Sequence, residues 1–430
     1  MLLLGGRKFS SKGNLLKSKE NTLRQRECCG MKFCEDYLQV SDGLRIFAAE
    51  WCIMWHSHDR LTKMKNRLQS LDVLRGLTLF MLVFFGPVVS QLLSTIGADW
   101  CGPVLFQLEH EPWEGFRVWD LLMPQFLFMA GASMPFSLQK YIGQKGQGRA
   151  WRRIARRFVL LFILGMMVQG NLLGLDPKRI YLYSNTLQAI ACGYVIAAVI
   201  LLNCKKMRWQ IVWTAALLMV YWIGMVLGGD YSQDGNFCEI VDRAVLGRFR
   251  DGVYWDADGV WHFAEWYRYT WIWSSLTFGA TVMTGCLAGE WIRRSQKPRT
   301  ALLMVLTGVG MLLGAKLWSL GMPIIKHIWT SSMALYAAGW SMVLLGILFY
   351  VIDCRGWDRG WTWLKVYGMN SITAYFLGET VNFRSIVNSL SYGLQQYMGD
   401  YYEVWLTFGN FALVYLILYL MYKTKVFVRV

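Results

Sequence analysis

Residues 109–138 read EHEPWEGFRVWDLLMPQFLFMAGASMPFSL. The run begins with His110 among three carboxylates and continues as an apolar segment long enough to enter a bilayer. Asp120 lies about one turn inside the start of that segment. An imidazole titrates near neutral pH, and a carboxylate in an apolar segment needs a partner. The pair therefore predicts proton chemistry at a membrane surface, and most of the remaining chain is interpreted as the scaffold that holds it.

The composition is typical of an integral membrane protein. The 430 residues are 55% hydrophobic and 17% charged, with a mean hydropathy of +0.30, whereas soluble domains carry about 25% charged residues. The net charge of +16 is explained by basic residues in short loops between apolar runs, as the positive-inside rule requires, and not by nucleic-acid binding. The ten cysteines lack metal-ligand spacing and predict neither a metal site nor a disulfide framework.

Apolar runs of about 20 residues predict an all-α integral membrane protein with about ten transmembrane helices. The runs cover 71–96, 116–138, 155–173, 184–203, 209–229, 270–292, 300–321, 331–352, 361–380 and 404–423. The run 361–380 fits the pattern least well, because it contains Lys365, Asn370 and Glu379. Basic residues gather in alternate loops, so both termini are expected to be cytoplasmic, with His110 on the outer side.

Two regions outside these runs need separate interpretation. Residues 1–63 are charge-rich and aperiodic, which predicts a disordered or non-native N-terminal extension before a membrane domain at 64–430; an amphipathic surface helix around 44–55 is the alternative. The loop 230–268 combines six aspartates with aromatic residues, five of them between Tyr254 and Trp266. It is long for a simple connection, which predicts either a sugar-binding surface or a structured cap.

His110 and Asp120 are the strongest candidates for catalysis. His110 can act as a general base or as a nucleophile toward an acyl group, and Asp120 can orient it as the acid of a catalytic triad does. The alternatives are an interfacial histidine without a role and a purely structural pairing of Asp120 with Arg117 or Arg179.

Other polar residues lie at the predicted helix ends. Asp72 and Arg75 share one helix face, which predicts a local ion pair or a phosphate contact from the cytoplasm. Asn370 either hydrogen-bonds across helices or belongs to a site.

A second group lies on the predicted outer side. Arg179 and Gln188 flank the start of the fourth predicted span, and Lys326 and His327 occupy a short loop. These are either surface residues or parts of a pocket beside His110.

Six segments of the chain occur in an order that resembles a known family. They are LDVLRG (71–76), HEPWEG (110–115), DLLMPQFLFMAG (120–131), LQAIA (187–191), KHIWTSS (326–332) and GMNSI (368–372). Together they resemble the transmembrane acyltransferases related to heparan-α-glucosaminide N-acetyltransferase, and in particular the bacterial-type members. The resemblance extends over residues 64–425, nearly all of the predicted membrane core.

The resemblance implies acetyl transfer from cytoplasmic acetyl-CoA, a co-substrate and not a bound cofactor, to an amino sugar or glycan on the outer side. It implies that His110 is the active histidine and that Asp120 lies in the family's D-L-x-x-P segment. The expected substrate or donor contacts are Asp72, Arg75, Arg179, Gln188, Lys326, His327 and Asn370.

The chain departs from the family at one position. The family often carries an Asn shortly before the active histidine, suited to hold an oxyanion, but no Asn occurs between Arg75 and His110. A replacement donor is expected from Ser90, Gln91 or elsewhere, since losing such a donor costs about 10²–10³ in rate.

The expected location is the plasma (inner) membrane, with multiple spans. The expected partners are acetyl-CoA, an amino sugar or glycan and the lipid bilayer, without nucleic acid; a homodimer stays open. Two other classes fit the same composition: a transporter or flippase for a sugar or lipid-linked sugar, and a catalytically inactive membrane scaffold.

Overall fold

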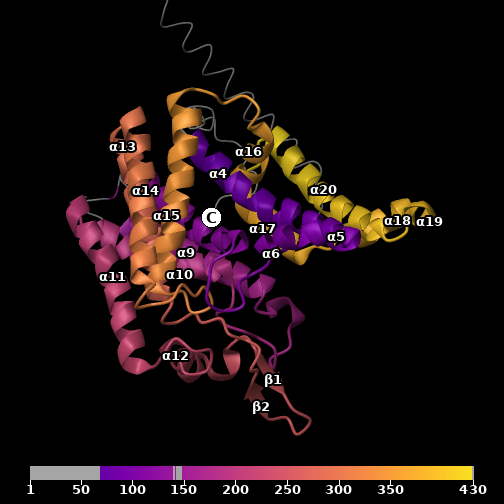
Figure 1. Cartoon of the computed structure of the whole chain (residues 1–430), viewed down its shortest axis with the longest axis horizontal. Coiled ribbons are helices and arrows are strands. Elements are labelled where there is room, and N and C mark those ends of the chain that lie inside the picture. Colours follow the sequence, from indigo (N-terminus) through magenta and orange to yellow (C-terminus); the bar gives the residue numbers. More distant parts are fainter. Residues whose placement is uncertain (1–67, 139–140, 142–147, 429–430) are drawn as a thin grey trace, which may run out of the picture. The chain divides into compact units, whose positions relative to one another are not determined.

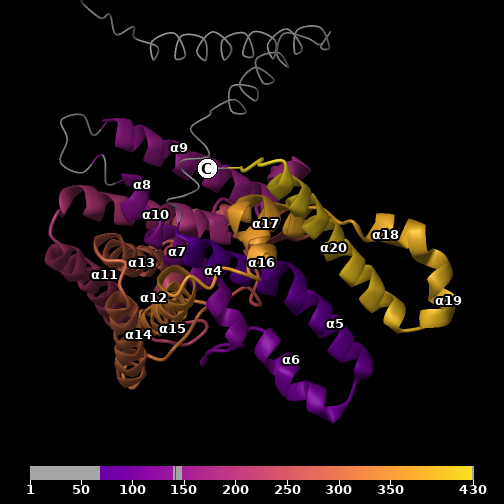
Figure 2. The same ribbon diagram turned by 90° about the horizontal axis from the view of Figure 1, so that it is seen from above.

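The computed structural model describes residues 68–138, 141 and 148–428, which belong to one unit of the chain, Leu68–Val430. This part of the chain is mostly helical (Figures 1 and 2). The predictions about residues 1–63 lie outside the described residues.

Seven helical segments of the described chain are long and apolar enough to cross a membrane. They coincide with seven of the ten predicted runs: Gln69–Ile96, Val118–Leu138, Thr186–Asn203, Met207–Gly228, Pro298–Trp318, Ser331–Cys354 and Tyr401–Lys423. The prediction of a helical, multi-pass membrane protein is thus confirmed. The count of ten spans and the cytoplasmic termini stay predictions.

The other three predicted runs are helical but differ in character. Helix α9 (Gly148–Val168) carries five arginines in its first ten residues, and α13 (Ser275–Arg294) is rich in glycine, alanine and threonine. The run 361–380 is divided at Asn370 into α16 (Thr362–Met369) and α17 (Ser371–Thr380). The Asn370 amide bonds to the backbone of Val426 and Val428, so this side chain competes with the regular helix. The prediction that residues 361–380 form one continuous helix is therefore wrong.

The remaining elements follow in chain order. They are α4 (Gln69–Phe80), the π-helical turn η1 (Met81–Phe85), α5 (Gly86–Ile96), η2 (Asp99–Cys101), α6 (Gly102–Leu108), η3 (Val118–Leu121), α7 (Leu122–Ala132), α8 (Met134–Leu138), η5 (Leu172–Gly174), α10 (Thr186–Asn203), α11 (Met207–Gly228), α12 (Phe237–Leu246), η6 (Gly247–Phe249), β1 (Val253–Trp255), β2 (Trp261–Phe263), α14 (Pro298–Trp318), α15 (Ser331–Leu348), η7 (Phe349–Cys354), α18 (Arg384–Ser391), η8 (Tyr392–Leu394), α19 (Gln395–Met398) and α20 (Tyr401–Lys423).

The centre of the bundle is held by backbone-to-backbone contact between α7 and α13. A Cβ atom on Gly131 would lie 1.9 Å from the carbonyl oxygen of Val282, and one on Gly285 would lie 1.9 Å from that of Phe128. Small residues allow this approach, which is the usual means of helix association where the surroundings are as apolar as the side chains. The contact fixes the helix that follows Asp120.

Two of the six segments that carry the family resemblance meet in a second close contact between helix backbones. A Cβ on Gly76 would lie 1.9 Å from the carbonyl oxygen of Leu364, and one on Gly368 would lie 1.9 Å from that of Asp72. The glycines of LDVLRG and GMNSI therefore serve to pack α4 against α16.

The first span bends beside the candidate site. A π-helical turn at Met81–Phe85 precedes Pro87, which supplies no N–H to the helix. Beyond the bend, α5 lies between α6 and α20, and α20 leads back to α18 and α19 (Figure 2).

The long loop 230–268 is a structured segment. It contains α12 and a small hairpin in which β1 pairs antiparallel with β2, with Tyr254 opposite His262. Figure 1 places both elements at the same end of the bundle as the lower end of α11.

Candidate active site

Two loops that are distant in the sequence are joined at one end of the bundle. The Gly115 N–H donates to the carbonyl oxygen of Ile324 (2.9 Å), and Glu114 forms a bridge with Ile325. This pairing brings His110 beside Lys326, which lies 216 residues further along the chain.

Asp120 is the buried centre of the cluster and has no exposed surface. Its Oδ1 lies 2.8 Å from Nδ1 of His110, while Oδ2 accepts the backbone N–H groups of Arg117 (3.1 Å) and Glu111 (3.2 Å). A carboxylate held by two backbone donors has a fixed orientation. It accepts the Nδ1 proton of His110, which leaves the Nε2 lone pair available.

Lys326 completes the cluster. Its Nζ lies 3.2 Å from Oδ1 of Asp120, 2.8 Å from Nδ1 of His110 and 3.4 Å from Nε2 of the same ring. Only 5% of the side chain is exposed. Burial lowers the pKa of Lys326 to about 8, against the opposing effect of the Asp120 charge, so the side chain is an ammonium at neutral pH.

His327 supplies a second imidazole. Its ring lies between Trp113 and Tyr269, with centroid distances of 5.6 and 4.4 Å. Burial, followed by the neighbouring charge of Lys326, lowers the pKa of His327 to about 4. The ring is therefore neutral at physiological pH, and its buried Nδ1 has no hydrogen-bond partner among the described residues.

A cavity of about 500 Å³ opens beside the cluster. Polar and aromatic side chains form one part of its wall, and residues of the bent first span and of α7 form another. The lining includes Leu82, His110, Trp119, Met123, Phe126, Asp251, Trp266, Tyr269, Lys326, His327 and Glu379. The imidazole of His110 thus faces a space large enough for a small substrate, while Asp120 lies behind it.

The structural alternative for Asp120 is not supported. The guanidinium of Arg117 pairs with Glu111 at 2.7 Å, and only its backbone N–H reaches Asp120. Arg179 is largely exposed and pairs with Asp176 at 3.7 Å. The alternative that Asp120 pairs with the side chain of one of these arginines is therefore wrong, and Lys326 is the basic side chain that Asp120 contacts.

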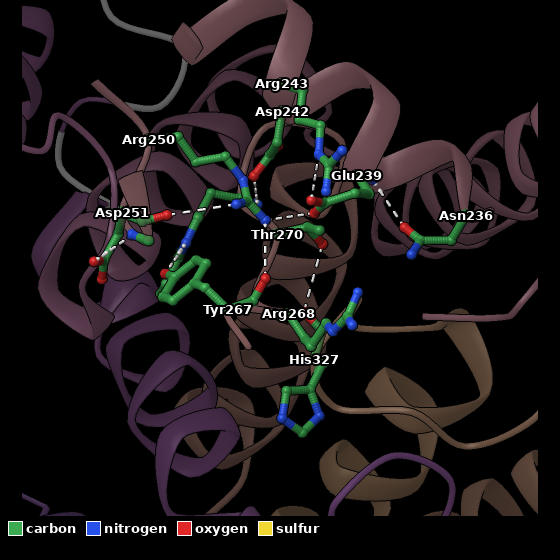
Figure 3. Close-up of polar contacts among 12 residues, drawn as sticks. Asn236, Glu239, Asp242, Arg243, Arg250, Asp251, Tyr267, Arg268, Thr270 and His327 are labelled. Carbon is green, nitrogen blue, oxygen red and sulfur yellow. Dashed lines mark hydrogen bonds and ion pairs between the residues drawn. The ribbon is translucent and has the colours of Figure 1, made fainter. Parts of the chain in front are cut away.

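A buried ion network supports one wall of the cavity (Figure 3). The fully buried Arg250 donates to Glu239 (2.5 Å) and to the carbonyl oxygen of Tyr267 (3.4 Å). Asp242 on α12 accepts the N–H groups of Trp271 (2.7 Å) and Ile272 (2.9 Å), and burial raises its pKa to about 7. These contacts fix the segment that carries the cavity residues Trp266 and Tyr269.

The acidic residues of the long loop fall into two groups. Its acids largely serve the cap: Asp256 pairs with His262 at 2.8 Å, and Asp234 pairs with Arg268. Asp251 and Trp266 instead line the cavity.

Several predicted site residues lie away from the cavity lining. Gln188 is buried and caps its own helix by accepting the N–H groups of Ser184 (2.9 Å) and Asn185 (3.1 Å). Asp72 and Arg75 are 3.5 Å apart near the other end of the first span, and Asn370 ties down the C-terminal segment. The cavity unites four of the nine predicted residues: His110, with Asp120 behind it, Lys326 and His327.

Glu379 was missed by the sequence reasoning. It lines the cavity and makes no hydrogen bond or ion pair with the described residues. The sequence contained a signal for it, because a carboxylate within an apolar run marks a candidate functional residue.

The fold and this cluster define a helical membrane protein with a carboxylate-oriented imidazole facing a cavity. Residues 67–236 match the family model of the catalytic region of heparan-alpha-glucosaminide N-acetyltransferase. The Homo sapiens enzyme of that name is 24% identical over 375 residues, covering 74% of this chain and 53% of that protein. The Mus musculus enzyme is 28% identical over 142 residues, covering 31% of this chain and 19% of that protein.

The chain is a relative of the heparan-alpha-glucosaminide N-acetyltransferases. It spans about half the length of the human protein. The family model covers His110 and Asp120 and ends before Lys326 and His327.

Proposed function

We propose that this protein is a membrane N-acetyltransferase, which moves an acetyl group from cytoplasmic acetyl-CoA to an amino sugar or glycan on the outer side of the plasma membrane. The observation that carries the proposal is the imidazole of His110, oriented by the buried Asp120 and facing a cavity. The kinship to N-acetyltransferases supports the same reaction class.

His110 is the residue that handles the acetyl group. With its Nδ1 proton directed to Asp120, the Nε2 lone pair is free either to attack the thioester carbonyl or to take a proton from the acceptor amine. Asp120 stabilises the positive charge that the ring carries in both routes.

The cap provides features suited to a sugar acceptor. Trp266 lines the cavity and is 78% exposed, which offers a flat apolar face for a sugar ring. Asp251 and Glu379 add carboxylates suited to an ammonium group or to hydroxyls.

The donor side is supported by charge. Four exposed arginines of α9, namely Arg149, Arg152, Arg153 and Arg156, form a cationic surface suited to the phosphates of CoA. Arg75 near the start of the first span is a further candidate for this contact.

The test uses sealed membrane vesicles with radiolabelled acetyl-CoA on the cytoplasmic side and glucosamine on the other. Wild type is compared with His110→Ala and with His110→Gln, which keeps a polar side chain of similar size. Labelled N-acetylglucosamine is expected with wild type and not with either variant.

Each competing function predicts a different result. Movement of glucosamine across the membrane without acetyl-CoA would favour a transporter. Retention of the wild-type phenotype in a His110→Ala strain would favour an inactive scaffold. Ping-pong kinetics would favour an acetyl-histidine intermediate, and a requirement for both substrates bound together would favour direct transfer.

A further inference from the structure

The position of Lys326 over the ring of His110 has no role in the function described so far. The ammonium contacts both ring nitrogens at similar distances, 2.8 Å to Nδ1 and 3.4 Å to Nε2. An in-plane hydrogen bond to Nδ1 would place Nζ much farther from Nε2 than from Nδ1. Nζ therefore lies over one face of the ring, and the in-plane Nδ1–H bond to Asp120 can form at the same time.

This placement determines what the ammonium can reach. Nucleophilic attack uses the in-plane lone pair of Nε2, so the carbonyl carbon of the acyl group would arrive in the ring plane. The oxygen of the resulting adduct then projects to one side of that plane. The ammonium lies nearer to Nδ1 than to Nε2, so a shift of about 1 Å along the ring face toward Nε2 is needed to bring it within hydrogen-bond reach of this oxygen.

We propose that Lys326 is a catalytic residue that supplies the oxyanion-binding donor for acetyl transfer through His110. This inference rests on the proposed function. Nε2 bonds to the thioester carbon, the carbonyl π electrons move to oxygen, and the Lys326 ammonium stabilises the oxyanion. The C–S bond then breaks, leaving acetyl-His110 and the CoA thiolate.

The acceptor completes the reaction with balanced atoms and charge. The amine nitrogen attacks the acetyl carbon and the carbon–Nε2 bond breaks, which regenerates His110. The acceptor ammonium gives up two protons in total, one to the CoA thiolate and one to solvent. Lys326 stabilises the oxyanion in both halves and keeps its own proton.

Burial makes this donor effective. Lys326 is almost fully removed from solvent, so its charge acts on the developing negative charge of the acyl oxygen with little screening by water. The position also provides a donor in a chain that has no Asn between Arg75 and His110.

A simpler role for Lys326 is to neutralise the buried carboxylate of Asp120. The two roles are separated by a double-mutant cycle. If Lys326 only neutralises Asp120, then Lys326→Met has no further effect once Asp120→Asn has removed the charge. If Lys326 binds the oxyanion, the second substitution slows the reaction in both backgrounds.

The experiment measures the release of CoA from acetyl-CoA in a single turnover without acceptor, using the full chain in nanodiscs, and then kcat and KM with glucosamine. Lys326→Met is expected to lower the single-turnover rate and kcat by about 10²–10³, with a much smaller change in KM. Lys316→Met is the matched control, since Lys316 is exposed at the end of α14 and does not line the cavity.

The test can still be made if the single variant Lys326→Met folds poorly. The double variant removes both opposite charges, so neither is left buried without a partner, and its comparison with Asp120→Asn gives the effect of Lys326 directly. A Lys326→Met rate within about tenfold of wild type, or no effect in the Asp120→Asn background, would overturn the inference but leave the proposed function intact. Absence of thioester cleavage and acetyl transfer in wild type would overturn both.

Discussion

Polar clusters at the two ends of the helical bundle are built in opposite ways. At one end, Asp353 accepts the N–H groups of Gln69 (3.2 Å) and Ser70 (3.0 Å), and Asn370 bonds to the backbone of the C-terminal segment. At the other end, His110, Asp120 and Lys326 contact one another beside a cavity. Polar groups whose hydrogen bonds go to the backbone hold the membrane fold together, whereas charged side chains that meet beside a cavity are available for chemistry.

The strongest test of this comparison is the loss of the imidazole. His110→Ala is expected to lower kcat by about 10⁴, because it removes the group proposed to handle the acetyl carbon or the amine proton. The measurement is acetyl transfer to glucosamine by purified protein. Asp353→Asn at the opposite end serves as the control, and equal losses in both variants would abolish the distinction between the two ends.

Asp120→Asn is expected to lower kcat by about 10², since the amide can donate to Nδ1 of His110 and favour the unproductive tautomer. The tautomer can be followed by NMR of ¹⁵N-labelled histidine. A variant with full activity and an unchanged ring tautomer would argue against the orienting role of Asp120.

The wall of the cavity is expected to respond to pH through Asp242. Its pKa of about 7 in the folded protein exceeds the unfolded value of about 3.9, so the folded state binds more protons between these values. The contribution of this group to the free energy of unfolding is greatest below about pH 4 and is lost as the pH rises through 7. The unfolding temperature of Asp242→Asn should therefore vary less with pH in this range than that of wild type.

The readout for Asp242 is thermal unfolding in detergent, followed by tryptophan fluorescence. Asp234→Asn is the matched control, because its carboxylate is 77% exposed. An identical pH dependence in wild type and Asp242→Asn would contradict the assigned cause.

The smallest effect is expected at the end of the bundle that carries Asp353, opposite the cavity. Asp353→Ala removes the carboxylate that accepts the first N–H groups of α4, and such a loss costs about 1 kcal/mol of stability. Chemical denaturation should show this change while acetyl transfer per folded molecule stays close to wild type. A large loss of transfer would mean that this end also takes part in the reaction.

The sequence alone was sufficient to predict the membrane class, seven of the helical segments and the pair His110–Asp120. Hydropathy reports these features directly, and a carboxylate one turn inside an apolar run is visible without coordinates. The placement of Lys326 over the ring could not be predicted. It depends on the pairing of Gly115 with Ile324, which leaves no trace in local periodicity.

Gln188 and Asn370 show what residue type leaves undetermined. Each is a polar residue in an apolar run, and each uses its amide to satisfy backbone groups while its own side chain does not line the cavity. Whether such a residue bonds to backbone or belongs to a functional site depends on where its side chain points, and the residue type does not specify this direction.

The glycine contact between α7 and α13 has a consequence for how substrates enter. Because Gly131 and Gly285 leave no space between the two backbones, sliding or rocking of one helix against the other would drive main-chain atoms together. The side of the cavity that carries Asp120 is therefore expected to stay rigid. Movements that open the cavity are expected instead in wall segments outside this contact, such as the first span, α17 and the cap.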